Sequence, residues 1–152
     1  MKNPALKKYK AKRNLKKSGE PEAKIKKSKG KIFVIHRHEA SHLHYDLRLE
    51  INKVLKSWAV PKEPPTTKGV KRLAIAVEDH PIGYATFEGT IPEGNYGAGK
   101  VQIWDNGTFE LIKKTPKEIE FKLKGKKMKG TFVLIKTDYG SKPGKSWLFF
   151  KV

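Results

Sequence analysis

Large apolar and polar side chains alternate without interruption from Leu43 to Ile51. Because successive side chains of an extended chain point to opposite faces, this alternation predicts a β-strand with one face in a hydrophobic core. The core face would carry Leu43, Tyr45, Leu47, Leu49 and Ile51. The opposite face would carry imidazole, carboxylate and guanidinium groups in one row, from His42, His44, Asp46, Arg48 and Glu50.

Short segments with a similar pattern continue from residue 31 to the C-terminus, with turn residues between them. We expect strands at residues 32–38, 43–51, 54–60, 72–78, 84–88, 100–104, 108–113, 119–123, 130–137 and 146–152. Asp105-Asn106-Gly107 predicts a hairpin turn, because Asn and Gly tolerate positive φ angles. No segment shows sustained helical periodicity. The pattern predicts an all-β fold, a compact closed or nearly closed antiparallel β-barrel, because closure removes exposed strand edges. A sandwich of two sheets is the alternative.

The chain is strongly basic along its whole length, with a formal net charge of +19. Residues 1–31 carry a net charge of +11 and residues 32–152 a net charge of +8. We expect residues 1–30 to form a basic N-terminal tail, partly ordered at most, and residues 31–152 to form the barrel. Tyr9, Leu15 and Ile25 are available anchors for the tail. A field of this sign attracts polyanions, so nucleic acid is the expected partner, and a merely solubilising surface is the alternative.

The chain contains no cysteine, which excludes disulfides and thiolate metal sites. No apolar run approaches the roughly 20 residues that a membrane span requires. The lysine-rich N-terminus also lacks the apolar segment of a secretory signal. We therefore expect a cytoplasmic monomer without membrane contact.

Two imidazoles and one carboxylate fall close together in this pattern. His44 and Asp46 share a strand face, and antiparallel pairing would bring His38 opposite His44. Three such ligands leave coordination positions open, as in a catalytic site, and nitrogen and oxygen ligands suit Mn²⁺, Zn²⁺ or Fe²⁺. Arg48 follows on the same face with a planar fork suited to phosphate. An ion pair of Arg48 with Asp46 or Glu50 is the alternative.

A second strand repeats this arrangement between Arg72 and His80. Arg72, Glu78 and His80 share its polar face, and small alanines between them leave space for a groove floor. His80 precedes Pro81, which restricts its backbone to extended values. A fixed imidazole there would suit a phosphate ligand or a general acid, and Tyr84 offers a hydroxyl nearby. Structural roles for His80 and Tyr84 are the alternatives.

Two other functions are open on these residues alone. His44-x-Asp46 with a distant His80 is also similar to the triad of two histidines and one carboxylate in non-haem Fe(II) oxygenases. The adjacent Arg48 and the high positive charge favour a phosphate substrate instead. A basic β-barrel that only binds nucleic acid is the second alternative, and it leaves the row of His, Asp and Arg unexplained.

The order of these motifs resembles the 3′-phosphoesterase domain of bacterial and archaeal DNA ligase D. The resemblance covers nearly the whole chain, through Phe33-Val34-Ile35-His36-Arg37-His38, His42–Glu50, Ser57-Trp58-Ala59-Val60-Pro61-Lys62, Val77-Glu78-Asp79-His80-Pro81, Phe87–Gly99 and Trp147–Lys151. It implies a compact β-barrel with an active-site groove and Mn²⁺-dependent trimming of DNA 3′ ends. Such enzymes remove a terminal ribonucleoside as phosphodiesterases and then hydrolyse the remaining 3′-phosphate to a 3′-hydroxyl.

The resemblance also assigns roles to residues of this chain. The metal ligands would be His38, His44 and Asp46, with Mn²⁺ as the metal and Zn²⁺ or Co²⁺ as possible substitutes. Arg48 and His80 would hold the scissile phosphate, with Tyr84 assisting nearby. Further positions that support activity would be Arg13, Glu20, Lys62, Arg72 and Glu78.

Two positions depart from the family pattern, which commonly has Gln at His36 and Asp at Asn14. We expect His36 either to hydrogen-bond in place of the glutamine or to add a metal ligand. The ligase and polymerase domains of the full enzyme are missing, so the resemblance implies a stand-alone form. It would act on duplex or primer-template DNA 3′ ends in the prokaryotic cytoplasm, at the nucleoid. A separate DNA ligase and the Ku end-binding protein would be its partners.

Overall fold

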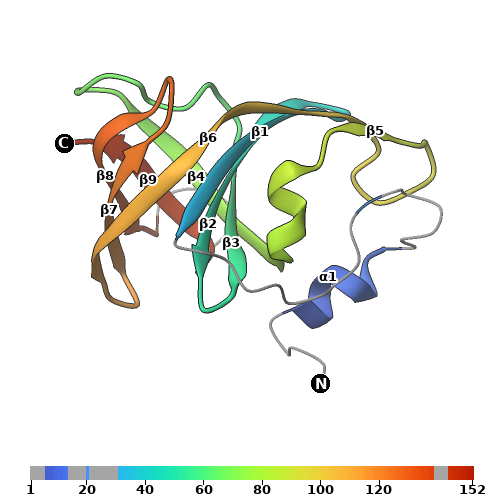
Figure 1. Cartoon of the computed structure of the whole chain (residues 1–152), viewed down its shortest axis with the longest axis horizontal. Helices are drawn as coiled ribbons and strands as arrows, with labels where there is room; N and C mark the ends of the chain where they lie inside the picture. Colours follow the sequence, from blue (N-terminus) through green and yellow to red (C-terminus); the bar gives the residue numbers. More distant parts are fainter. Residues whose placement is uncertain (1–5, 14–19, 21–30, 139–143) are drawn as a thin grey trace.

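The computed structural model describes residues 6–13, 20, 31–138 and 144–152. In this part of the chain nine antiparallel strands pair in the order β1-β2-β3-β4-β9-β8-β7-β6-β5, and β6 also pairs with β1. The second pairing of β6 closes eight strands into a barrel and leaves β5 outside the ring (Figure 1). The expected closed antiparallel β-barrel is therefore confirmed. The strands are β1 (Ile32–Glu39), β2 (Leu43–Ile51), β3 (Val54–Val60), β4 (Lys71–His80), β5 (Gly89–Ile91), β6 (Gly99–Lys114), β7 (Glu118–Lys124), β8 (Lys129–Lys136) and β9 (Ser146–Lys151).

The interior of the barrel is a continuous hydrophobic core. Phe33 and Ile35 of β1 are buried there with the alternate residues of β2. The rings of Phe121, Phe132 and Phe149 lie 5.7–6.3 Å apart between centroids and are fully buried. Such aromatic contacts add stability beyond the burial of apolar surface. Because the alternate residues of β1 and β2 fill this core, the polar residues between them point to the outer face of the barrel.

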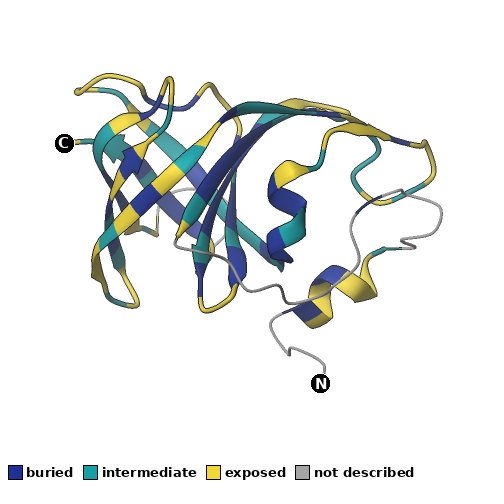
Figure 2. Cartoon of the chain, viewed as in Figure 1, coloured by how far each residue is buried: buried dark blue, intermediate teal, exposed yellow. Residues whose placement is uncertain are grey.

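The outer face of β1–β3 is also buried, under a second layer. This layer contains a short α-helix, α1 (Lys7–Ala11), and a 3₁₀ helix, η2 (Ile82–Thr86). A second apolar cluster joins them to the strands, and burying each large side chain in it contributes about 1.5–3 kcal/mol. Its members are Tyr9, Val34, Leu55, Ile82, Tyr84 and Ala85. Figure 2 shows buried residues along β1–β3 and on the side of η2 that faces them. The polar residues of the outer face therefore lie between two layers.

Both helices are short. None of the helices among the described residues has the length and apolar character that a membrane crossing needs. Tyr9 of α1 is fully buried, and its ring lies 6.0 Å from that of Tyr84. Leu15 and Ile25, the other anchors considered for the N-terminal segment, lie outside the described residues.

The prediction of a strand at residues 84–88 is wrong. Ile82–Thr86 form η2, in which the Tyr84 amide donates to the Pro81 carbonyl at 2.9 Å and the Phe87 amide donates to the Tyr84 carbonyl at 3.0 Å. Pro81 follows the last residue of β4 and has no N–H to continue the ladder. The chain therefore leaves the sheet at Pro81 and turns Tyr84 toward the outer face of the barrel.

The prediction of a hairpin turn at residues 105–107 is also wrong, because β6 runs through this segment and pairs with β1. Gly107 is needed for close packing rather than for a turn, since a Cβ there would lie 2.2 Å from the Lys124 carbonyl oxygen. The buried Asp105 carboxylate accepts the amides of Lys126, Lys127 and Met128 at 2.8–3.1 Å. It fastens the hairpin between β7 and β8 to the middle of β6.

The remaining expectations differ from the structure mainly at element ends. β2 and β3 have the expected bounds, whereas β5 was not expected. Leu43 lies at the start of β2 and is 43% exposed, although the alternation placed it in the core. Its position at the end of the strand explains the exposure, because the core packs against the middle of β2.

Candidate active site

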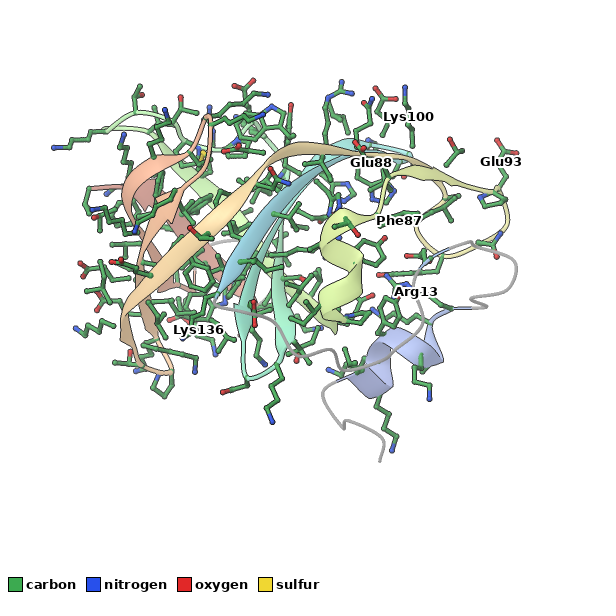
Figure 3. All side chains as sticks on the ribbon, in the orientation of Figure 1. Arg13, Phe87, Glu88, Glu93, Lys100 and Lys136 are labelled. Carbon is green, nitrogen blue, oxygen red and sulfur yellow. The ribbon has the colours of Figure 1, made fainter. Side chains whose placement is uncertain are left out.

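A cavity of about 280 Å³ opens between the outer face of the barrel and the second layer. Its lining residues come from β1–β5, from η2, from the loop before β6 and from the N-terminal segment. Figure 3 shows the Arg13 side chain pointing from the N-terminal segment toward the barrel. The cavity therefore gathers side chains that are far apart in the sequence.

Three potential metal ligands meet at one side of the cavity. Strand pairing places His38 of β1 directly opposite His44 of β2, as expected for an antiparallel arrangement. The ligand atoms of His38, His44 and Asp46 all lie within 4.8 Å of one another. The Asp46 carboxylate lies 3.3 Å from His44 Nε2 and 3.8 Å from His38 Nδ1. Burial alone would raise the pKa of Asp46, but Arg48 and the two histidines outweigh it and hold that pKa well below its usual value.

Backbone carbonyls orient both imidazoles for metal binding. A carbonyl can only accept a hydrogen bond, so His38 Nε2 donates to the Gly97 carbonyl at 2.7 Å and His44 Nδ1 donates to the His42 carbonyl at 3.3 Å. The opposite nitrogens, His38 Nδ1 and His44 Nε2, face Asp46 and, in the neutral rings, would offer their lone pairs to a cation bound there. Metal-binding histidines usually donate their other N–H to such an acceptor. The donor set therefore fits a divalent cation with open coordination positions.

Arg48 occupies the centre of the site and is only 3% exposed. Its Nε donates to His36 Nδ1 at 3.1 Å, and its terminal nitrogens donate to Ser57 Oγ at 2.9 Å and to Asp46 at 3.2 Å. The guanidinium also lies 4.8 Å from the centroid of the Tyr84 ring. Three of its five N–H groups are used in these bonds, and the second N–H of Nη1 faces His80 Nδ1 at 3.2 Å, which leaves one N–H of Nη2 for a ligand.

His36 lies behind Arg48 and does not join the metal-ligand group of the described residues. Its Nε2 donates to the Phe87 carbonyl at 3.0 Å, while Nδ1 accepts from Arg48. Burial, together with the charge of Arg48, lowers the pKa of His36 to about 3. The neutral ring thus presents one donor and one acceptor, as a glutamine side chain would, so the structure supports the hydrogen-bonding role rather than the added ligand.

His80 is held as a neutral hydrogen-bonding ring at the end of β4. Arg13 can only donate, so the contact of 3.1 Å makes His80 Nε2 the acceptor. His80 Nδ1 then donates to the Glu78 carbonyl at 2.9 Å, and Arg48 Nη1 lies 3.2 Å from the same nitrogen. Burial and the charges of Arg48 and Arg13 hold the pKa of His80 well below its ordinary value. His80 is not part of the metal-ligand group of the described residues. The oxygenase-like set of His44, Asp46 and His80 is therefore not formed.

The N-terminal segment supplies one wall of the cavity. Arg13 donates to Glu20 at 3.0 Å and to Glu78 at 2.8 Å, and the Tyr84 hydroxyl donates to Glu20 at 2.8 Å. Burial raises the pKa of Tyr84, which keeps this hydroxyl protonated. Arg13, Glu20, Glu78 and Tyr84 all line the cavity.

Other expected residues lie elsewhere. Lys62 and Arg72 do not line the cavity, and Arg72 donates to the Glu63 carbonyl at 2.8 Å. Asn14 lies outside the described residues.

Sequence reasoning missed three contributors to the site. Ser57 of β3 lies opposite Arg48 of β2 in the strand register and accepts its hydrogen bond. Tyr96 and Gly97 were named only within the Phe87–Gly99 motif and received no role of their own. Register and backbone contacts of this kind leave no local signal, although the alternation of β3 does place Ser57 on the outer face.

Comparison with known proteins agrees with these observations. A family described as the DNA Ligase D 3′-phosphoesterase domain matches residues 36–136. The chain is 43% identical to the multifunctional non-homologous end joining protein LigD of Pseudomonas aeruginosa over 96% of its length, and it covers 18% of that protein. It is 46% identical to the corresponding DNA repair protein LigD of Mycobacterium tuberculosis over 94% of its length, and it covers 19% of that protein. The chain thus spans less than a fifth of each of these relatives.

Proposed function

The chain belongs to the DNA ligase D 3′-phosphoesterase family, and on this basis we propose that it is a metal-dependent enzyme that repairs DNA 3′ ends. The observation that carries the proposal is the cluster of His38, His44 and Asp46 beside the buried Arg48. This cluster combines a divalent-metal ligand set with a guanidinium that still has an N–H group to donate. That combination suits a phosphate ester better than an uncharged substrate.

The cluster of two histidines and Asp46 would hold the metal ion. Mn²⁺ is the cation we propose, and Zn²⁺ or Co²⁺ would fit the same ligands. When bound, the ion would act as a Lewis acid toward the phosphate and offset negative charge in the transition state.

Arg48 and His80 complete the proposed phosphate site. Arg48 is fixed by three hydrogen bonds and keeps one N–H of Nη2 for a ligand, so it is oriented before the substrate arrives. His80 Nδ1 is fixed by the Glu78 carbonyl and Nε2 accepts from Arg13, so His80 would bind a phosphate oxygen once Nε2 gains a proton, which the negative charge of a bound phosphate favours. Tyr84 holds Glu20 against Arg13 and thereby supports the same wall.

We propose two successive hydrolyses at this site. In the first, water adds to the phosphorus and the bond to the 5′ oxygen of the terminal ribonucleoside breaks, which releases that nucleoside and leaves a 3′-phosphate. In the second, water adds to the phosphorus of this monoester and the bond to the 3′ oxygen breaks, which leaves a 3′-hydroxyl and inorganic phosphate. The product is an end that a ligase can use.

The basic surface would supply affinity for the DNA strand through its phosphates, and binding should weaken as salt rises. The relatives are named for non-homologous end joining, so we propose the same process for this chain. A DNA ligase and the Ku end-binding protein would then be its partners.

The proposal is tested by incubating the protein with Mn²⁺ and a primer-template that ends in one ribonucleotide. We expect a 3′-phosphate product to appear first and a 3′-hydroxyl product to follow, with both abolished by a chelator. His44→Ala and His80→Ala should lose this activity, whereas His42→Ala, an exposed histidine of the same hairpin, should retain it. Binding of DNA without any change at its 3′ end would support the binding-only alternative and refute the proposal.

A further inference from the structure

Tyr96 is an exposed aromatic residue at the mouth of the cavity. It is 47% exposed and is the one exposed residue among those that line the described cavity. We propose that the Tyr96 ring forms the binding subsite for the base of the leaving nucleoside. This inference rests on the proposed function, and it assigns the specificity for a terminal nucleoside to a residue outside the metal and phosphate groups.

The deep part of the cavity is unsuitable for a nucleobase. Asp46, Arg48 and His80 are 6%, 3% and 3% exposed and are bonded to one another or to the backbone. Tyr84 is the other tyrosine of the cavity, but it is 2% exposed, its hydroxyl is bonded to Glu20 and its ring lies against Arg48. A base attached to a phosphate at Arg48 must therefore lie toward the mouth.

The structure holds the Tyr96 ring close to that phosphate position from two sides. On one side the neighbouring Gly97 accepts the hydrogen bond from the potential metal ligand His38 at 2.7 Å. On the other side the Arg13 guanidinium lies 5.2 Å from the ring centroid of Tyr96 and also bonds to His80. The ring thus lies next to Gly97, which contacts His38, and next to Arg13, which contacts His80.

The loop of Tyr96 is shaped by its own backbone. The Asn95 amide donates to the Pro92 carbonyl at 3.3 Å, and the Ala98 amide donates to the Asn95 carbonyl at 3.1 Å. Lys12 Nζ lies 3.4 Å from the Tyr96 hydroxyl and 4.9 Å from its ring centroid. These contacts limit the positions that the ring can adopt, so less freedom would be lost when a base stacks on it.

A tyrosine ring can stack on any base, because every base presents a π-face. Removing such a ring typically costs about 1–3 kcal/mol per base, which is equivalent to about a 5- to 150-fold change in rate or affinity. The two proposed reactions differ in their need for this contact. The diester carries a nucleoside beyond the scissile phosphate, whereas the 3′-phosphate monoester carries none. Loss of the ring should therefore change the ratio of the two activities.

The test compares kcat/KM on a DNA that ends in a ribonucleotide and on the same DNA with a 3′-phosphate. We expect Tyr96→Ala to lower the ratio of diesterase to monoesterase activity by about 5- to 150-fold, and Tyr96→Phe to restore it because the ring remains. Ile112→Ala removes an exposed apolar side chain of β6 outside the cavity and serves as the control that changes neither activity.

A second substrate, with a terminal ribose that lacks its base, checks the contact directly. The wild-type protein should cleave it as slowly as Tyr96→Ala cleaves the complete substrate, and Tyr96→Ala should cleave both diesters equally well. An equal loss of both activities in Tyr96→Ala, or no loss of either, would overturn the subsite while leaving the proposed function intact. Absence of both activities from the wild-type protein would overturn the proposed function and the subsite together.

Discussion

Replacing His36 by glutamine is expected to preserve the bonds around Arg48 while removing a group that titrates in the unfolded chain. The imidazole donates to the Phe87 carbonyl at 3.0 Å and accepts from Arg48 Nε at 3.1 Å. A glutamine amide offers one N–H₂ and one carbonyl oxygen, so it can make the same two contacts. We therefore expect His36→Gln to fold and to retain phosphoesterase activity.

The size of the effect on stability follows from the pKa of His36. Burial, together with Arg48, lowers this pKa to about 3 in the folded protein, against about 6.5 in an unfolded chain. Folding thus favours the neutral ring, and this contribution is complete above pH 6.5 and is lost as the pH falls toward 3. At pH 5 the unfolded chain is protonated at His36 while the folded protein is not. This difference removes about 2 kcal/mol of stability relative to pH 8.

Urea unfolding at pH 8 and pH 5, with a chelator present so that metal loss does not contribute, measures this difference. The free energy of unfolding should fall by about 2 kcal/mol less in His36→Gln than in the wild-type protein. His42→Gln, a substitution of an exposed histidine on the same hairpin, should fall as the wild-type protein does. An equal decline in wild type and His36→Gln would refute the assignment of a buried neutral ring. Loss of activity at pH 8 would refute the equivalence of the two side chains.

Three further substitutions test other contacts. Asp105→Asn places an N–H₂ group against backbone donors and should lower the free energy of unfolding by about 1–3 kcal/mol in urea titrations, without changing kcat. Gly107→Ala brings a methyl group to 2.2 Å from the Lys124 carbonyl and should cost about 1–3 kcal/mol, which a lowered melting temperature would reveal. Burial alone would raise the pKa of Glu78, but Arg13 holds it below its usual value, so this carboxylate stabilises the protein above about pH 4.5 and loses that effect in acid. Glu78→Gln should therefore be less stable than wild type by about 1–3 kcal/mol at pH 7, with a much smaller gap at pH 3.

Local alternation was sufficient to predict the strands that face the core. β2 has the expected bounds because its apolar residues stand at every second position, and β3 has them too, although Lys56 interrupts the row of Val54, Trp58 and Val60. The same rule failed at Tyr84, where Pro81 ends the ladder, and at Gly107, where glycine serves close packing rather than a turn. At Tyr84 the deciding feature is the local proline, whereas at Gly107 it is a contact with the distant Lys124, which local alternation does not contain.

In the site, too, local alternation predicted some residues, while others depend on contacts that it does not contain. His44, Asp46 and Arg48 share one strand face, so their proximity follows from the period of an extended chain, and pairing with β1 adds His38 as expected. The contributions of Ser57 and Gly97 depend on strand register and on a backbone carbonyl. Arg13 and Glu20 came only from the family resemblance, since nothing local connects them to β4.

The three potential metal ligands all come from the hairpin of β1 and β2, between His38 and Asp46. The ring instead closes where Glu39 pairs with Lys100 and Ile32 with Thr108, more than sixty positions apart in the chain. Contacts between near neighbours in sequence form sooner than long-range pairings, because a shorter loop loses less entropy on closing. We expect the hairpin to form early in refolding and the seam between β1 and β6 to form late. Pulsed hydrogen exchange would show this as earlier protection of β2 amides than of the β6 amides that bond to β1, and the reverse order would contradict it. A cation added during refolding would thus meet its ligands before the barrel has closed.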